Sequence, residues 1–127
     1  MTRGFLLPDG WILGLLVPAE TQHPCALRVV PDSSVGLSDT LGGALLDENA
    51  LDGTPTHRCW LYLDVFRHAS GLPPNDRLHE LAAALGWPAD RDGWRGPALL
   101  TGRTVDWADR NIPSVVVAAA LRAGLPL

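Results

Sequence analysis

Two His-x-Cys pairs are the residues of this sequence whose type and spacing point most directly to chemistry. They are His23 with Cys25 and His57 with Cys59. In an extended chain, residues two apart face the same side, so each pair could offer an imidazole and a thiolate to one tetrahedral zinc ion. Structural zinc sites more often use Cys-x-x-Cys knuckles, and Pro24 restrains the first pair. We therefore favour two partly buried, reduced cysteines beside surface histidines, and we expect no metal or other cofactor.

A second group of side chains could support acid–base chemistry. Asp64, His68, His79 and Glu80 flank a Gly-Leu-Pro-Pro-Asn segment, and imidazole titrates near neutral pH. Asp64 and His68 are the candidate catalytic pair. His79 and Glu80, however, are adjacent, so on a helix they point about 100° apart. A solvated helix flank explains them, and this explanation is favoured over catalysis.

The chain also lacks the common signatures of catalytic and nucleotide-binding sites. All ten basic residues are arginine, which excludes a lysine Schiff base and a P-loop lysine. The sequence contains neither a Gly-x-Ser-x-Gly nucleophile elbow nor a Gly-x-Gly-x-x-Gly loop. The sequence thus favours a non-enzymatic protein and leaves catalysis open.

Tryptophan and arginine in the second half of the chain indicate either a core lid or a recognition surface. Three of the five tryptophans lie in loops between the later predicted elements, and Arg91 is one of three arginines that could form a surface with them. Such rings commonly cover the end of a core, and this placement is favoured. Tryptophan and arginine are also preferred binding hot spots. The candidate binding residues, including the asparagine of the Gly-Leu-Pro-Pro-Asn segment, are Trp87, Trp94, Arg95, Trp107, Arg110 and Asn75.

The elements that must position these residues are predicted from periodicity and turn signals. Apolar or alternating runs bounded by Gly and Pro predict strands over 5–7, 11–17, 25–30, 44–46, 60–66 and 97–101. Pro8-Asp9-Gly10 would make the first two a hairpin, over residues 5–17. In the 60–66 strand, Leu61, Leu63 and Val65 are expected to face inward, whereas 47–56 is expected to be a polar loop.

Helices are predicted in three places. Asn75 caps a helix that ends at Gly86, and Pro113 begins a last helix that runs to Arg122. A short helical turn runs from Ser33 or Ser34 toward residue 41. The sequence predicts one small α+β domain over 1–127, with a mostly antiparallel or mixed sheet and two main helices packed on it.

Composition restricts the compartment and the partners. The chain has 127 residues, 46% of them hydrophobic, and a net charge of −4. Its arginines are scattered singly, which disfavours direct nucleic-acid binding. The longest apolar stretch, 5–17, is too interrupted to span a bilayer and does not resemble a secretory signal. We therefore expect a cytoplasmic protein with no membrane contact. A protein partner is expected, and a homodimer is left open.

Four segments of the chain form an ordered pattern. They are Leu41-Gly42-Gly43, Leu61-Tyr62-Leu63-Asp64, Gly71-Leu72-Pro73-Pro74-Asn75 and Gly96-Pro97-Ala98-Leu99-Leu100-Thr101-Gly102. In this order, over residues 35–120, they resemble the family of unknown function DUF3846. Asp64 stands where the family tends to have Asn, and Arg67 replaces its usual turn glycine. The family is found in phages and in bacteria, many of them actinobacteria. The resemblance implies a mobile-element setting and no catalytic residue.

Two functions are consistent with these observations. The leading hypothesis is a non-enzymatic accessory protein of a phage or mobile element that binds a host or defence protein. The alternative is a small ligand-binding domain or enzyme that uses the Gly71–Asn75 turn together with Asp64 and His68.

Overall fold

The fold is that of a computed structural model, which describes residues 9–20, 22–51, 58–88, 93–104 and 106–125. Six strands and three helices alternate along the chain, confirming the predicted α+β class. They are β1 (Trp11–Val17), β2 (Ala26–Pro31), α1 (Ser34–Thr40), β3 (Leu46–Leu51), β4 (Cys59–Asp64), α2 (Asp76–Leu85), β5 (Ala98–Arg103), β6 (Asp109–Arg110) and α3 (Ser114–Arg122).

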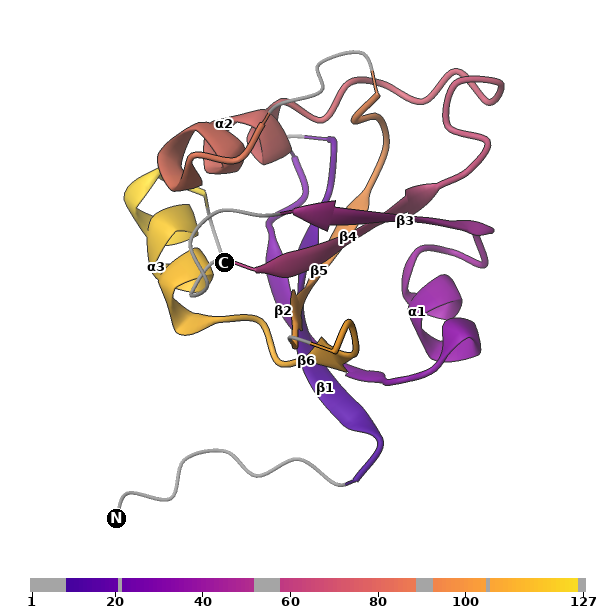
Figure 1. Ribbon diagram of the computed structural model, residues 1–127. Coiled ribbons are helices and arrows are strands. Elements are labelled where there is room, and N and C mark those ends of the chain that lie inside the picture. The colour runs from indigo at the N-terminus through magenta and orange to yellow at the C-terminus, as the bar shows by residue number, and fades with distance from the viewer. Residues whose placement is uncertain (1–8, 21, 52–57, 89–92, 105, 126–127) are drawn as a thin grey trace.

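The strands form one antiparallel sheet in the order β2-β1-β5-β4-β3, with β6 paired to the end of β5 (Figure 1). Two local hairpins, β1–β2 and β3–β4, supply four of these strands. β5 comes from much later in the chain and lies between the hairpins, pairing with β1 on one side and β4 on the other. Every residue of β5 is buried, as expected for a central strand.

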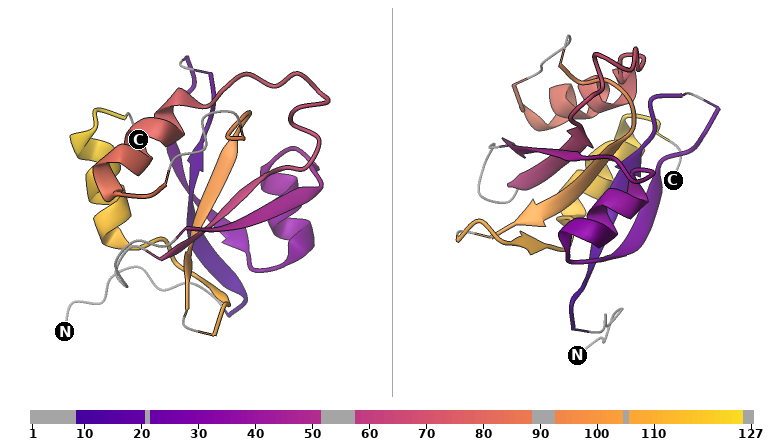
Figure 2. Two further views of the ribbon diagram at one scale, coloured as in Figure 1. Left: turned by 45° about the horizontal axis from the view of Figure 1, so that its top comes forward. Right: turned by 90° about the vertical axis from the view of Figure 1, so that its right-hand side faces the viewer.

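Both faces of the sheet are covered, which gives three layers (Figure 2). Cys59, Leu61 and Leu63 of β4 face α2 and α3, in the larger core cluster. Trp60 and Tyr62 alternate with them and face α1, in the smaller cluster. Because β4 must be apolar on both faces, its sequence is a nearly continuous apolar run rather than a clean alternation.

The helix α2 is fixed to the sheet by Asn75. The Asn75 Oδ1 accepts a hydrogen bond from the Leu78 N–H at 3.1 Å, which caps the helix as predicted. The Asn75 Nδ2 donates to the backbone oxygens of Val17 at 2.8 Å and Gly96 at 2.9 Å. The side chain is fully buried. One amide therefore joins the start of α2, the end of β1 and the entry to β5.

The short helix α1 depends on close contact with β2. Ser33 caps it as predicted, accepting from the Gly36 N–H at 3.1 Å. A Cβ on Gly36 would lie 2.5 Å from Pro31 Cβ and 2.9 Å from its carbonyl oxygen. Glycine is needed here for space, because a larger residue would separate helix and strand.

Two strand predictions need correction. The predicted polar loop at 47–56 is β3 as far as Leu51, since an edge strand paired to β4 tolerates polar side chains. β4 ends at Asp64, and Val65, expected to face inward, is 41% exposed in the following turn. β1 forms a hairpin with β2. The predicted hairpin over 5–17 stays a prediction, because its first strand, 5–7, lies outside the described residues.

The two main predicted helices are confirmed as α2 and α3, with Gly86 in the left-handed conformation at the end of α2. Across the residues that the structure describes, no helix is long and apolar enough to cross a bilayer.

Replacing Asn75 tests its role in joining α2 to the sheet. We expect Asn75→Ala to lower the free energy of unfolding by about 2–4 kcal/mol, because a cap is lost and two buried carbonyls lose their donor. Urea unfolding followed by circular dichroism measures this. Glu80→Gln, on the exposed flank of the same helix, should change stability by less than about 0.5 kcal/mol. Equal effects of the two substitutions would contradict the role of Asn75.

A second prediction concerns the contact of α1 with β2. Gly36→Ala should destabilise the protein by about 1–3 kcal/mol, because the added methyl group overlaps Pro31. Ser34→Ala, at an exposed position of the same helix, is the matched control and should be close to neutral. A Gly36→Ala protein as stable as the wild type in urea would show that α1 does not need this contact.

Candidate functional site

The turn between β5 and β6 presents an aromatic side chain to solvent. Thr104 N–H donates to the Ala108 oxygen at 2.9 Å, and Trp107 N–H donates to the Thr104 oxygen at 3.1 Å. Trp107 has a φ of 69°, the one positive value at a non-glycine residue among those described. Its side chain is 58% exposed. A large residue held in this sparsely populated conformation costs about 1–3 kcal/mol and commonly marks a functional position.

Neighbouring side chains hold the Trp107 ring in place. The Trp60 ring, on β4, lies 5.8 Å from it between centroids, with an interplanar angle of 52°. The Trp60 Nε1 donates to the Trp107 backbone oxygen at 3.3 Å. The Arg103 guanidinium carbon lies 4.5 Å from the Trp107 centroid and 5.7 Å from that of Trp60. We call Trp60, Arg103 and Trp107 the aromatic corner.

Arg103 is the base of the aromatic corner. It ends β5 and is only 4% exposed, so its guanidinium lies beneath the rings. A cation near two indole faces gains electrostatic stabilisation that increases as water is excluded. The arrangement restricts the rotation of Trp107, so that binding through this ring costs less side-chain entropy.

A buried polar cluster lies beside the aromatic corner on the α1 face of the sheet. The Tyr62 hydroxyl and the Thr101 hydroxyl each lie 2.6 Å from Asp109 Oδ1 and donate to it. Burial and the adjacent Asp109 carboxylate raise the pKa of Tyr62 above its ordinary value. Partial loss of hydration, and then the Asp109 charge, raise the pKa of Asp32. These contacts position β6 and therefore the turn that carries Trp107.

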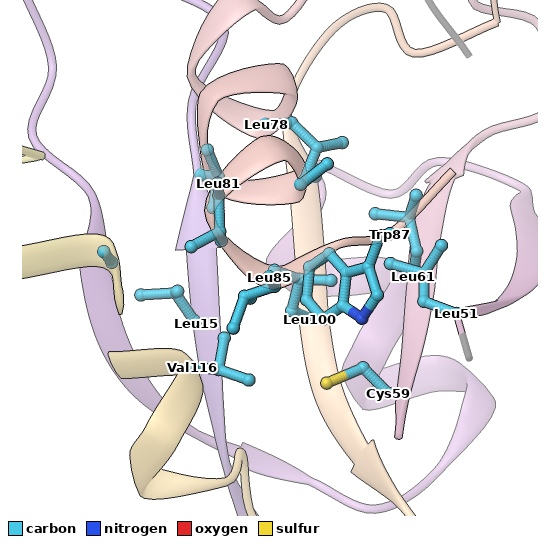
Figure 3. Packing of buried hydrophobic residues seen from close by; sticks show 14 of the residues in the cluster. Leu15, Leu51, Cys59, Leu61, Leu78, Leu81, Leu85, Trp87, Leu100 and Val116 are labelled. Carbon is cyan, nitrogen blue, oxygen red and sulfur yellow. The ribbon is translucent and has the colours of Figure 1, made fainter. Parts of the chain in front are cut away.

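Two of the predicted binding residues belong to the core. Trp87 and Trp94 are each only 4% exposed. Trp87 packs near Cys59, Leu61 and Leu100 (Figure 3), and Trp94 stacks on His79 with centroids 5.2 Å apart. A recognition surface made of all three loop tryptophans is therefore wrong. Trp87 and Trp94 instead cover the end of the core, which was the favoured explanation.

The remaining candidates for that surface are also dispersed. Arg95 donates to the Leu72 oxygen at 3.2 Å and so supports the turn before α2. Arg110 is opposite Gly102 in the sheet and lies beside Pro113, at the start of α3. Asn75 is buried by its structural role. Arg91 lies outside the described residues. Arg110 and Trp107 are both exposed, and Trp107 is the one aromatic candidate among the described residues that retains the exposure a recognition surface requires.

The candidate catalytic pair, Asp64 and His68, lies at the end of β4 and in the turns that follow it. Asp64 Oδ1 accepts from the Phe66 N–H at 2.8 Å, which closes the turn after β4. His68 is exposed in the following turn. Arg67, between them, pairs with Asp47 at 2.7 Å and donates to the Asp64 and Gly93 backbone oxygens. Arg67 therefore connects three segments, which are β3, the turn after β4 and the segment before β5.

The two flanking residues of the predicted acid–base group stay apart from this turn. His79 is half-buried against the Trp94 ring, and Glu80 is exposed on the flank of α2. The separate surroundings of the two side chains agree with the predicted helix flank rather than with a shared acid–base site.

In the predicted His/Cys pairs, the cysteines are buried, whereas the described histidine, His23, is exposed. Cys25 is 1% exposed, whereas the His23 side chain is 61% exposed and lies 3.1 Å from a Glu20 oxygen. Cys59 is fully buried, and His57 lies outside the described residues. Burial raises the pKa of both thiols, that of Cys59 to about 12, which disfavours the thiolate that zinc binds. Within the described ranges, no three His, Cys, Asp or Glu side chains gather as a metal site.

Sequence reasoning missed two members of the aromatic corner, Trp60 and Arg103. The alternation along the 60–66 strand puts Trp60 on the face opposite Leu61, which was the available signal. The proximity of Trp60 to Trp107 depends on the pairing of β4 with β5 and on the β5–β6 turn, both of which are long-range features.

Comparison with known proteins bears on the fold alone. No protein-family model matches the chain, and no curated protein matches it. A crystal structure of the small RNA methyltransferase HEN1 is similar, with a TM-score of 0.61 and 13% sequence identity. The match covers 91% of this chain and 16% of that one. At this identity the likeness shows a shared fold, in a protein of which this chain matches about one-sixth of the length.

Proposed function

We propose that this protein is a non-enzymatic binding module that engages a protein partner through the aromatic corner. The observation that carries the proposal is Trp107, which is 58% exposed although its backbone is held at a φ of 69°. Burying such a ring on its own protein would be favourable. An exposed and preorganised tryptophan is what an interface anchor requires.

The chemistry of the aromatic corner fits a protein partner. Trp60 is half-buried beside Trp107, so the two rings form one continuous apolar surface with the guanidinium below. An apolar side chain of the partner would be covered by both rings, and backbone carbonyls at the rim would meet the Trp107 turn. Aromatic and arginine side chains contribute much of the binding energy of protein interfaces.

The alternative, a ligand-binding or catalytic turn at Gly71–Asn75, has less support. All the described hydrogen bonds of the Asn75 side chain are to backbone groups inside the protein. The turn is itself attached to the β5 entry, since the Gly96 N–H donates to the Pro73 oxygen at 2.8 Å. Its polar groups are used in building the fold.

The biological setting of the proposal comes from the resemblance to DUF3846. It suggests an accessory protein of a phage or mobile element in an actinobacterial cell, acting in the cytoplasm on a host or defence protein. The lysine-free composition is consistent with a GC-rich genome.

Substitution of Trp107 tests the proposed function. The wild-type protein should retain a partner from an actinobacterial lysate, and the affinity for that purified partner should fall at least about tenfold in Trp107→Ala. Calorimetry with the purified partner measures the change. The affinity should fall because the substitution removes the anchor ring. The fold should be little affected, because the ring is exposed and contributes little to core packing.

Phe66→Ala is the matched control, since this aromatic ring is 54% exposed beyond the far end of β4. It should leave the affinity within about twofold of the wild type. If Trp107→Ala and Phe66→Ala bind the partner equally well, the aromatic corner is not the binding surface.

A further inference from the structure

A second surface lies along β2, one of the two edges of the sheet. β2 pairs with β1 on one side, and no described strand pairs with its other side. Leu27, Arg28 and Val29 in its centre are all exposed. The edge therefore offers backbone N–H and C=O groups together with apolar side chains, a combination that favours the addition of another strand.

Two hollows follow this edge on the α1 side and meet at Arg28 and Thr40. The larger one, of about 430 Å³, is mainly apolar and is lined by Leu16, Pro18, Pro24, Leu41 and Pro97. The smaller one, of about 250 Å³, lies between α1 and the end of β2 and includes Val30 and Asp39. Gly36 and Pro31, where α1 lies closest against β2, form one wall of the smaller hollow.

Arg28 gives this surface its charge preference. It projects from the middle of β2 and lines both hollows. Within the described part of the chain, no carboxylate lies within ion-pair distance of it. Asp39 lines only the smaller hollow, so a negative group beside Arg28 and over the larger hollow would meet a positive neighbour and apolar walls.

The opposite side of the same strand is apolar. Leu27 is opposite Leu15, and Val29 is opposite Leu13, on the face that carries α2 and α3. Leu27 and Val29 are 42% and 40% exposed. A strand added at this edge would therefore place alternate side chains over the hollows and the others against Leu27 and Val29.

We propose that the β2 edge binds an extended peptide segment of a partner protein, in which an acidic residue is flanked at two-residue spacing by apolar residues. The peptide adds a strand to the sheet through backbone hydrogen bonds. Its acidic side chain meets Arg28, and an apolar side chain two positions away fills the larger hollow. Strand addition with alternate side chains in pockets is an established mode of peptide recognition.

A second copy of this chain fits the edge less well. Symmetric antiparallel pairing centred on β2 would place Arg28 opposite or diagonal to the same residue of the other copy. Like charges in those positions are destabilising. Self-association is therefore an outcome that would contradict the proposal.

The test uses a blocked peptide, Thr-Leu-Val-Glu-Val-Leu-Thr, whose symmetric pattern suits either strand direction. Titrated into the full chain, it should shift the amide NMR signals of 26–30 and of the non-proline residues that line the hollows. A peptide with Arg in place of Glu should bind about threefold to tenfold more weakly, the size expected for an exposed ion pair and its reversal. A Glu peptide N-methylated on the nitrogens that face β2 should not bind, because the added strand loses its donors to that edge.

Protein variants complete the test. Arg28→Glu should reverse the preference between the Glu and Arg peptides, whereas Arg122→Glu, at an exposed position of α3, should not. Four outcomes would each overturn the proposal. The first two are equal binding of the Glu and Arg peptides and NMR shifts that lie elsewhere in the protein. The others are no binding at millimolar peptide and dimerisation of the protein through 26–31 in sedimentation. Trp107→Ala should leave peptide binding unchanged. The proposal for the β2 edge and the proposal for the aromatic corner can therefore be contradicted independently.

Discussion

The pairing of β5 with both β1 and β4 is the interaction on which the rest of the structure depends. Each hairpin, β1–β2 and β3–β4, is local in sequence and has two edges. β5 joins them through Leu15–Val17 on one side and Cys59–Tyr62 on the other. Only the joined sheet has faces broad enough to bury α2 and α3 on one side and α1 on the other. The aromatic corner follows from the same strand, because Arg103 ends β5 and the next turn carries Trp107.

Several polar side chains connect irregular segments of this fold. Asn75 and Arg67 bond to backbone carbonyls in other segments. Arg77 of α2 likewise donates to the His23 oxygen in the β1–β2 connection. A carbonyl buried without a donor is costly, so a loop-rich protein needs such donors where strand pairing stops. Arginine suits this task because one guanidinium carries several donors in fixed directions.

The two proposed surfaces differ in how they would recognise a protein. The aromatic corner is a small preorganised anchor, whereas the β2 edge offers backbone hydrogen bonds along about 20 Å of strand. They lie at different elements, β5–β6 and β2–α1, and share no residue. Simultaneous use of both by one partner would raise the overall affinity above that of either alone, provided that the partner spans them.

The sequence by itself determined the α+β class, the caps of α1 and α2, and the apolar character of β4, because these depend on neighbours within a few residues. Asn75, for example, was correctly placed as a helix cap from the apolar spacing behind it. Its second role, as donor to Val17 and Gly96, depends on segments 58 and 21 residues away and was decided by the tertiary structure. The same applies to the tryptophans. Their type and number indicated either a core or a surface role, and only the pairing of β4, β5 and β6 buried Trp87 and Trp94 while leaving Trp107 exposed. Local propensities act along the chain, whereas burial is a property of surfaces that meet only after the chain has folded.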